Sequence, residues 1–146
     1  MKSLIFALVA CSLIAATPSA AEPAPGFRAG AATSVITPPL GRPIIGNFIA
    51  PPSTNVHDEL HARCLVLDDG KTKLVLVVLD LLGTEMGMCA ETRGLIEKQL
   101  GIPSSNVLIS AVHTHSASSP GGKAPVPTEP EYENYRAFVV QRIVDG

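Results

Sequence analysis

The hydrophobic and polar positions divide the chain into a short series of predicted strands and helices. Small and apolar residues from 27 to 36 predict a first strand, which two prolines stop. Apolar stretches at 60–67 and 73–82 flank a tight turn at 68–71 that contains Asp, Gly and Lys. This arrangement predicts a β-hairpin whose second strand is buried.

A helix and another buried strand are predicted to follow the hairpin. Apolar residues recur at helical spacing between Glu85 and Leu100, Thr84 is the expected cap, and Gly101 stands just past the end. The next strand is predicted at 106–112. Strand, helix and strand in this order predict a crossover unit, with two parallel strands and the helix on one face of their sheet. The predicted fold class is therefore α/β, with a mixed sheet.

A long loop and a second helix complete the predicted elements. Glycines and prolines punctuate residues 40–56, which predicts an ordered loop of a length that usually serves a function or is disordered. Residues 128–131 have the pattern of a capped helix start with proline in the first turn. The expected apolar stripe of this helix consists of Tyr132, Tyr135, Phe138, Val139 and Ile143.

The first 26 residues precede the predicted domain at 27–146. A positive residue, an apolar run at 4–16 and small residues before Glu22 are typical of a cleaved export signal. We therefore expect residues 1–21 to be a signal peptide and 22–26 a tether rich in Pro and Ala, which predicts a periplasmic or secreted protein. The apolar run is too short for a transmembrane helix, which needs about 20 apolar residues, and no later segment comes closer.

Charge and cysteine content narrow the function classes. The 146 residues include 11 basic and 13 acidic side chains without a clustered basic face, so nucleic acid is not an expected partner.

The three cysteines are not expected to carry a lipid or a disulfide. Cys11 ends a stretch that resembles a lipoprotein box, but the apolar run continues beyond it, which favours cleavage before Glu22. Cys64 and Cys89 stand in apolar surroundings and are expected to be small buried side chains rather than a disulfide.

Two histidines stand where the predicted strand at 106–112 gives way to a loop rich in Ser and Gly. Residues two apart on an extended chain face the same side, so His113 and His115 can share one pocket. Imidazole is a common zinc ligand, but a catalytic zinc needs about three protein ligands. The pair is either half of a metal site or two strand-end histidines bonded to the backbone.

Other polar residues are candidates for a pocket at the same edge of the sheet, because ligands gather beyond the carboxyl ends of parallel strands. His57 ends the long loop, whereas His61 is expected at the surface. Arg63 either clamps an anionic or polar group or pairs with a nearby carboxylate. Asp80 either orients a ligating histidine or caps a turn or helix. Ser116 lacks a Gly-x-Ser-x-Gly elbow, which favours a loop serine over a nucleophile.

Three segments in this order resemble the amino-terminal part of the neutral/alkaline non-lysosomal ceramidase family. They are residues 27–38, residues 57–69 and the motif His-Thr-His-Ser at 113–116. The resemblance spans nearly all of the chain after residue 21. It implies an incomplete amino-terminal part of a larger α/β catalytic domain. It also implies a secreted zinc-dependent amidohydrolase that cleaves the N-acyl bond of ceramide or a related lipid amide, and so an encounter with a membrane surface.

The resemblance also assigns roles to the histidines. The first histidine of the motif is a zinc ligand in the family, which implies this role for His113, and the second, His115, lies near the substrate and would stabilise an oxyanion. Zinc would polarise the amide and lower the pKa of water. After Ser116 the family usually reads Gly-Pro-Gly-Gly, where this chain has Ala-Ser-Ser-Pro-Gly-Gly, and the family's Gly-Tyr pair in the loop is Gly46-Asn47 here.

The family's remaining zinc ligands, a histidine, a glutamate and a tyrosine, belong to later parts of a longer chain, as does a pocket serine. No residue of this sequence matches them, so the zinc site is expected to be completed only by residues beyond 146. The chain is therefore predicted to be the front of such an enzyme. The alternative is an exported binding or remnant domain without catalytic activity.

Overall fold

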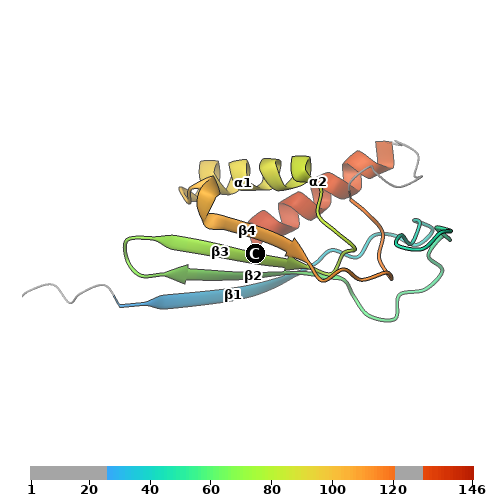
Figure 1. The fold of residues 1–146 in the computed structure, drawn as a ribbon, viewed down its shortest axis with the longest axis horizontal. Coiled ribbons are helices and arrows are strands. Elements are labelled where there is room, and N and C mark those ends of the chain that lie inside the picture. Colours follow the sequence, from blue (N-terminus) through green and yellow to red (C-terminus); the bar gives the residue numbers. More distant parts are fainter. Residues whose placement is uncertain (1–25, 121–129) are drawn as a thin grey trace, which may run out of the picture.

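A mixed four-stranded sheet with two helices on one face forms the fold (Figure 1). The computed structural model describes residues 26–120 and 130–146. The sheet order is β1-β2-β3-β4, with antiparallel pairing except between β3 and β4, which are parallel. The elements are β1 (Arg28–Val35), β2 (His61–Asp68), β3 (Lys73–Leu79), α1 (Met86–Leu100), the 3-10 turn η1 (Ser104–Asn106), β4 (Val107–Ala111) and α2 (Pro130–Asp145). The predicted α/β class with a crossover helix is confirmed.

The turn between β2 and β3 is stabilised by two aspartates. Asp68 Oδ1 accepts a hydrogen bond of 2.8 Å from the Gly70 amide, and Gly70 has a φ of 86° that suits glycine. Asp69 Oδ1 accepts from the amides of Lys71 and Thr72, at 2.9 and 2.7 Å. These backbone bonds to the ionised form hold the pKa of both carboxyl groups below the usual value.

Helix α1 begins with a glutamate cap, so the predicted Thr84 cap is wrong. The Glu85 carboxylate accepts from the amides of Gly87 and Met88, at 3.1 and 3.3 Å. Its longer side chain reaches two of the free donors of the first turn, where a negative charge is also favoured by the helix dipole. Gly101 ends the helix in a left-handed conformation with φ of 66°, as predicted.

The hydrophobic core lies between the sheet and the two helices. Burial alternates along β3, so that every second side chain faces the helices and the others face away. Cys64 and Cys89 are both buried and unbonded, which confirms the prediction for them. The buried side chains include Ala62, Val75, Val77, Leu79, Val107 and Ile109 from the strands and Met88, Ile96, Tyr135, Val139, Val140 and Ile143 from the helices.

Helix α2 buries part of its predicted stripe and joins the beginning of the domain to its end. The Tyr135 hydroxyl donates a 2.8 Å hydrogen bond to the Ile36 carbonyl, and the Arg42 guanidinium carbon lies 4.7 Å from the ring centroid. Burial raises the pKa of Tyr135 far above its usual value, so the hydroxyl remains a donor. Phe138 was predicted to belong to the buried stripe but is exposed. The Tyr132 side chain and the predicted cap at 128 lie outside the described residues.

The second face of the sheet is apolar and has no layer over it within residues 26–120 and 130–146. Both helices lie on the other face (Figure 1). Leu74, Val78, Leu108 and Val112 are exposed on this outer face, beside partly buried leucines of β2 and β3. A contiguous apolar surface of this kind is typical of a face that packs against another layer of protein.

Replacing Tyr135 with Phe should lower the stability of the fold. The substitution removes the hydroxyl and leaves the buried Ile36 carbonyl without that donor, so the free energy of unfolding should fall by about 1–2 kcal/mol. Urea unfolding followed by circular dichroism measures this change. Phe138→Tyr on the same helix is the matched control and should cost less than about 0.5 kcal/mol, because Phe138 is exposed and the variant keeps the ring that stacks on Tyr135. Equal losses in the two variants would contradict this account of α2.

The turn aspartates predict a loss of stability in acid. A carboxyl group whose pKa is lower in the folded state stabilises the protein above its unfolded pKa, about 3.9 for Asp, and this contribution disappears as the pH falls through the folded pKa. Thermal unfolding midpoints should therefore drop below about pH 4. Asp69→Asn keeps an acceptor for the turn amides but does not titrate, so its midpoint should fall less steeply. An unchanged acid profile in this variant would refute the role of Asp69.

Candidate functional site

The candidate site lies at the edge of the sheet where the parallel strands β3 and β4 end. Their pairing continues past the strands, because Val112 N donates to Leu79 O at 3.0 Å and Thr114 N donates to Leu81 O at 3.2 Å. The two segments that leave the strands thus remain side by side. Residues far apart in the sequence meet at this edge, as expected for the carboxyl ends of parallel strands.

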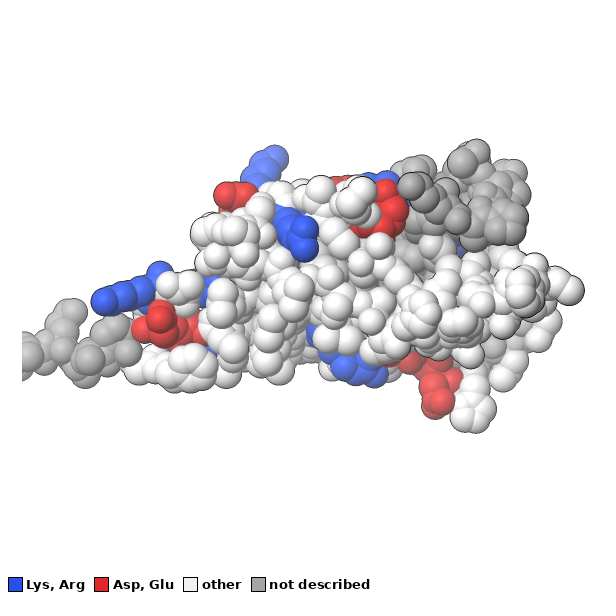
Figure 2. All heavy atoms as spheres, viewed as in Figure 1, with Lys and Arg blue, Asp and Glu red and all other residues white. Residues whose placement is uncertain are grey.

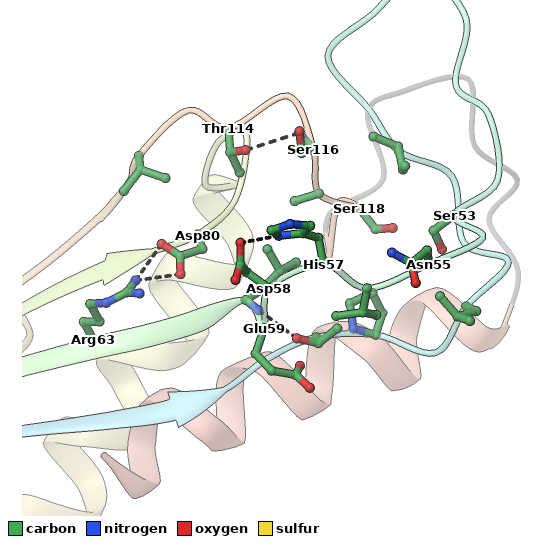
Figure 3. A pocket seen from close by; sticks show the side chains of 18 residues that line it. Ser53, Asn55, His57, Asp58, Glu59, Arg63, Asp80, Thr114, Ser116 and Ser118 are labelled. Carbon is green, nitrogen blue, oxygen red and sulfur yellow. Dashed lines mark hydrogen bonds and ion pairs between the residues drawn. The ribbon is translucent and has the colours of Figure 1, made fainter.

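A pocket of about 650 Å³ opens beside these strand ends (Figure 3). Four residues predicted from the sequence, His57, Arg63, Asp80 and Ser116, all line it. They come from the loop before β2, from β2 itself and from the segments after β3 and β4. Apolar lining residues are Pro38, Leu40, Ile44, Val56, Leu60, Val112 and Ala117, and further polar ones include Ser53, Asn55 and Thr114.

An ion pair between Arg63 and Asp80 forms one wall of this pocket (Figure 3). Arg63 Nη1 lies 2.6 Å from each Asp80 carboxylate oxygen, so the arginine pairs with this residue and not with the acidic residues before it. Asp80 Oδ2 also accepts from the His61 amide at 3.0 Å. Of the two roles considered for Asp80, the structure shows neither a helix cap nor a bond to His113; the carboxylate joins the end of β3 to β2.

His61 is partly buried, so its predicted surface position is wrong. The antiparallel register of β2 and β3 brings it opposite the end of β3, where the Asp80 amide donates to His61 O at 3.0 Å. Its Nδ1 lies 3.7 Å from Asp80 Oδ2. His57, by contrast, is exposed at the pocket rim and donates from Nδ1 to Asp58 at 2.7 Å, if that nitrogen carries the proton.

The backbone of His113 is left-handed, with φ of 64°. This conformation costs about 1–2 kcal/mol for most residues with a side chain, although histidine adopts it more often than bulky residues do. His113 Nδ1 lies 2.7 Å from the Leu82 carbonyl oxygen. Because a carbonyl only accepts, Nδ1 must be the donor, which leaves Nε2 with a free lone pair in the neutral ring. A histidine that binds a metal through Nε2 has this hydrogen bond on its other nitrogen.

The rings of His113 and His115 meet, although not for the reason that the sequence suggested. The expectation assumed an extended chain, whereas β4 ends at Ala111 and the backbone turns at His113. The ring centroids are 5.1 Å apart and the planes cross at 77°. Neither histidine belongs to the lining of the pocket, although Thr114 and Ser116, which alternate with them, do.

Gly46 holds the long loop against His115, a contact that sequence reasoning missed. A Cβ atom at Gly46 would lie 2.8 Å from Cγ of His115 and 2.9 Å from Nδ1, closer than such atoms can approach. Gly46 also has a φ of 106°, which favours glycine. The glycine itself was visible in the sequence, but its partner lies 69 positions away, so no local pattern could reveal the contact.

Two hydrogen bonds tie the loop to the segment that follows the histidines. Ile45 N donates to Ala117 O at 3.0 Å, and Ser118 Oγ donates to Pro43 O at 2.8 Å. Ser118 is buried and its hydroxyl is used in this contact, so it acts as a structural serine of the loop. The loop and the histidine segment therefore form one connected wall.

Within the described parts of the chain, no three His, Cys, Asp or Glu side chains are grouped so that they could hold a metal ion. His113 and His115 supply two imidazoles, whose ring centroids are 5.1 Å apart. None of the helices within residues 26–120 and 130–146 has the length and hydropathy needed to cross a bilayer.

Comparison with solved structures identifies the fold. The crystal structure of neutral ceramidase from Pseudomonas aeruginosa matches with a TM-score of 0.66 and 22% identity, over 82% of this chain and 20% of that chain. A ceramidase complexed with C2 matches with a TM-score of 0.62, 22% identity and the same coverage. No family model matches the chain, and a search of characterised proteins found no match.

This likeness concerns a fraction of a larger molecule. The chain spans about one fifth of the length of the two ceramidase structures. At 22% identity the likeness establishes the fold and not the chemistry. The resemblance to ceramidases that the motifs indicated thus extends to three dimensions, and the fold is that of a part of a neutral ceramidase.

Proposed function

We propose that this chain is the amino-terminal part of an exported, zinc-dependent amidohydrolase that cleaves the N-acyl bond of ceramide or a related lipid amide. The observation that carries the proposal is the state of His113, whose Nδ1 is bonded to Leu82 O while Nε2 remains available. This histidine lies two residues after the parallel strand β4, in a fold that matches neutral ceramidase structures over 82% of the chain. Export through residues 1–21 is part of the proposal, and those residues lie outside the described structure.

His113 fits the role of one zinc ligand. Its tautomer, fixed by the Leu82 carbonyl, presents the unprotonated nitrogen that a metal requires. The remaining ligands would come from residues outside the described ranges, because a catalytic zinc needs about three protein ligands. Zinc, when bound, polarises the amide carbonyl and makes water more acidic.

His115 fits the role of a hydrogen-bond donor to the substrate. Its ring is held between the His113 ring, 5.1 Å away between centroids, and the backbone of Gly46. A donor that is fixed before the reaction stabilises the negative charge that develops on the amide oxygen, because no reorganisation is needed at that moment. The close contact with Gly46 supplies this fixed position.

The pocket suits a substrate that is both apolar and polar. Its volume of about 650 Å³ is in the range of small-molecule sites. Its lining combines aliphatic side chains with hydroxyl and amide groups and with the charged residues Asp58, Glu59, Arg63 and Asp80. The Asp80 carboxylate balances the positive charge of Arg63. The pair therefore offers hydrogen bonds to a substrate without a net charge of its own. This arrangement favours a neutral polar group, such as the hydroxyls and amide of a sphingoid lipid, over an anionic one.

Replacing His113 with Gly tests the proposed zinc ligand. In the full-length protein this variant should lose bound zinc and lower the hydrolysis of N-acylsphingosine by at least about 100-fold. Glycine adopts the left-handed backbone without strain, so the free energy of unfolding should change by less than about 1 kcal/mol. Zinc per protein, released fatty acid and the unfolding midpoint are the measurements.

His61→Asn is the matched control for His113→Gly, since it removes an imidazole that is not bonded to the Leu82 carbonyl and keeps the backbone amide that Asp80 binds. This control should retain zinc. Full amidase activity in folded His113→Gly would refute the proposed site. A wild-type protein that unfolds cooperatively but neither retains zinc nor hydrolyses lipid amides would favour the noncatalytic binding domain.

Replacing Asp80 with Asn tests the neutralised arginine in the pocket wall. The variant keeps an oxygen that can accept from the His61 amide but leaves Arg63 with an unpaired charge. We expect KM for the neutral lipid amide to rise about tenfold, with a smaller change in kcat, because the pocket wall has lost its geometry and neutrality. Arg28→Gln is the control, since it breaks the Arg28–Asp68 ion pair in another part of the sheet and should leave KM unchanged. Equal KM values for wild type and Asp80→Asn would contradict this role.

A further inference from the structure

The loop between β1 and β2 ends in an apolar tip with no charged side chain. Phe48 is fully exposed, at 111% of the reference value, and Ile49 is 76% exposed. Residues 43–56 contain no Lys, Arg, Asp or Glu. The described atoms at the right-hand end of Figure 2, over the loop drawn in cyan in Figure 1, are accordingly uncharged.

The tip is held away from the protein by a short ladder of backbone hydrogen bonds. Gly41 N donates to Ser53 O, Ser53 N to Arg42 O and Ile44 N to Pro51 O, each at 2.8 Å. The ladder joins the two sides of the loop below the tip and limits its collapse onto the sheet. Two adjacent large apolar side chains are therefore presented to solvent, which is costly unless a partner covers them.

The tip and the pocket share the same loop. Ile44, Ser53, Asn55 and Val56 line the pocket on both sides of the tip in sequence. The hydrogen bond from Ile45 N to Ala117 O fixes the tip relative to the segment that carries the histidines. Any surface that binds the tip would therefore lie next to the pocket.

We infer that Phe48 and Ile49 insert into the interface of a lipid bilayer and bring the pocket to the membrane surface. The inference rests in part on the proposed function, since a lipid amide substrate resides in the bilayer. An aromatic and a branched aliphatic side chain at a narrow protrusion suit the boundary between head groups and acyl chains. The absence of lysine and arginine from residues 43–56 points to a neutral, zwitterionic surface rather than an anionic one.

The outer face of the sheet is a different kind of apolar surface. It is broad and formed by strands, which suits packing against another layer of protein. The tip is a protrusion of two side chains, which a bilayer can accept without a shaped partner. The experiment must therefore separate these two surfaces.

The test is co-sedimentation of the full-length protein with phosphatidylcholine vesicles in the absence of substrate. The double substitution Phe48→Ser with Ile49→Ser should reduce partitioning to vesicles by at least about tenfold, because it removes the inserted apolar area. Binding of the wild type should be unchanged by about 0.5 M salt, since no charge attraction is involved. The unfolding midpoint should be unchanged, because both side chains are exposed.

Two control variants identify the surface that binds. Phe27→Ser removes an aromatic side chain that is 70% exposed just before β1, at the opposite end of the sheet from the loop (Figure 1). Leu108→Ser alters the outer face of the sheet. Both should bind vesicles as the wild type does. Loss of binding in either control equal to that of the double variant would overturn the inference.

Two further outcomes would count against insertion of Phe48 and Ile49 into the bilayer. Undiminished vesicle binding by the double variant would refute insertion of the tip. A lowered unfolding midpoint in the double variant would mean that the tip packs against other protein, which would refute it as well. His113→Gly should bind vesicles normally. A wild-type protein that binds through the tip but hydrolyses no lipid amide would overturn the proposed function and leave this inference standing.

Discussion

The parallel pairing of β3 and β4 is the constraint on which the candidate site depends. Without the bonds that continue this pairing through Val112 and Thr114, the segments that carry Asp80 and His113 would separate where the strands end. The crossover helix α1 makes the pairing possible, because parallel strands need a connection that returns the chain to the same end. The core between β3 and α1 thus affects the site indirectly, because it fixes the distance between the segments that follow β3 and β4.

Periodicity was enough to predict the elements but not the contacts between them. Alternating burial along β3 and helical spacing in α1 produced correct strands and a correct helix, because both patterns follow from local geometry. The Glu85 cap was missed because Thr84 has the stronger general preference, whereas a reachable carboxylate decided the outcome. The position of His61 depends on strand register, and register is a property of two strands rather than one.

The candidate site was predictable in composition and not in geometry. His57 and Asp80 could be selected because they end a loop and an apolar run, Ser116 because it lies beside the histidines, and Arg63 because a guanidinium can clamp a polar group. The structure brings all four to one pocket. The Arg63–Asp80 pair could not be foreseen, since acidic residues closer in sequence compete for the arginine. The left-handed backbone at His113 and the glycine that presses on His115 are tertiary features, which arise only when the long loop returns to the strand end.

The strain at His113 is informative because a residue without a Cβ atom would avoid it. Glycine adopts this left-handed conformation without steric cost, yet the chain has a histidine at this position. The turn falls on a histidine whose Nδ1 is satisfied by the Leu82 carbonyl, so the strained backbone accompanies a fixed ring orientation that leaves Nε2 available. A purely structural turn gains nothing from that orientation. A residue that must present Nε2 to a ligand does, and this difference favours a binding role for His113 over that of a histidine that merely ends a strand.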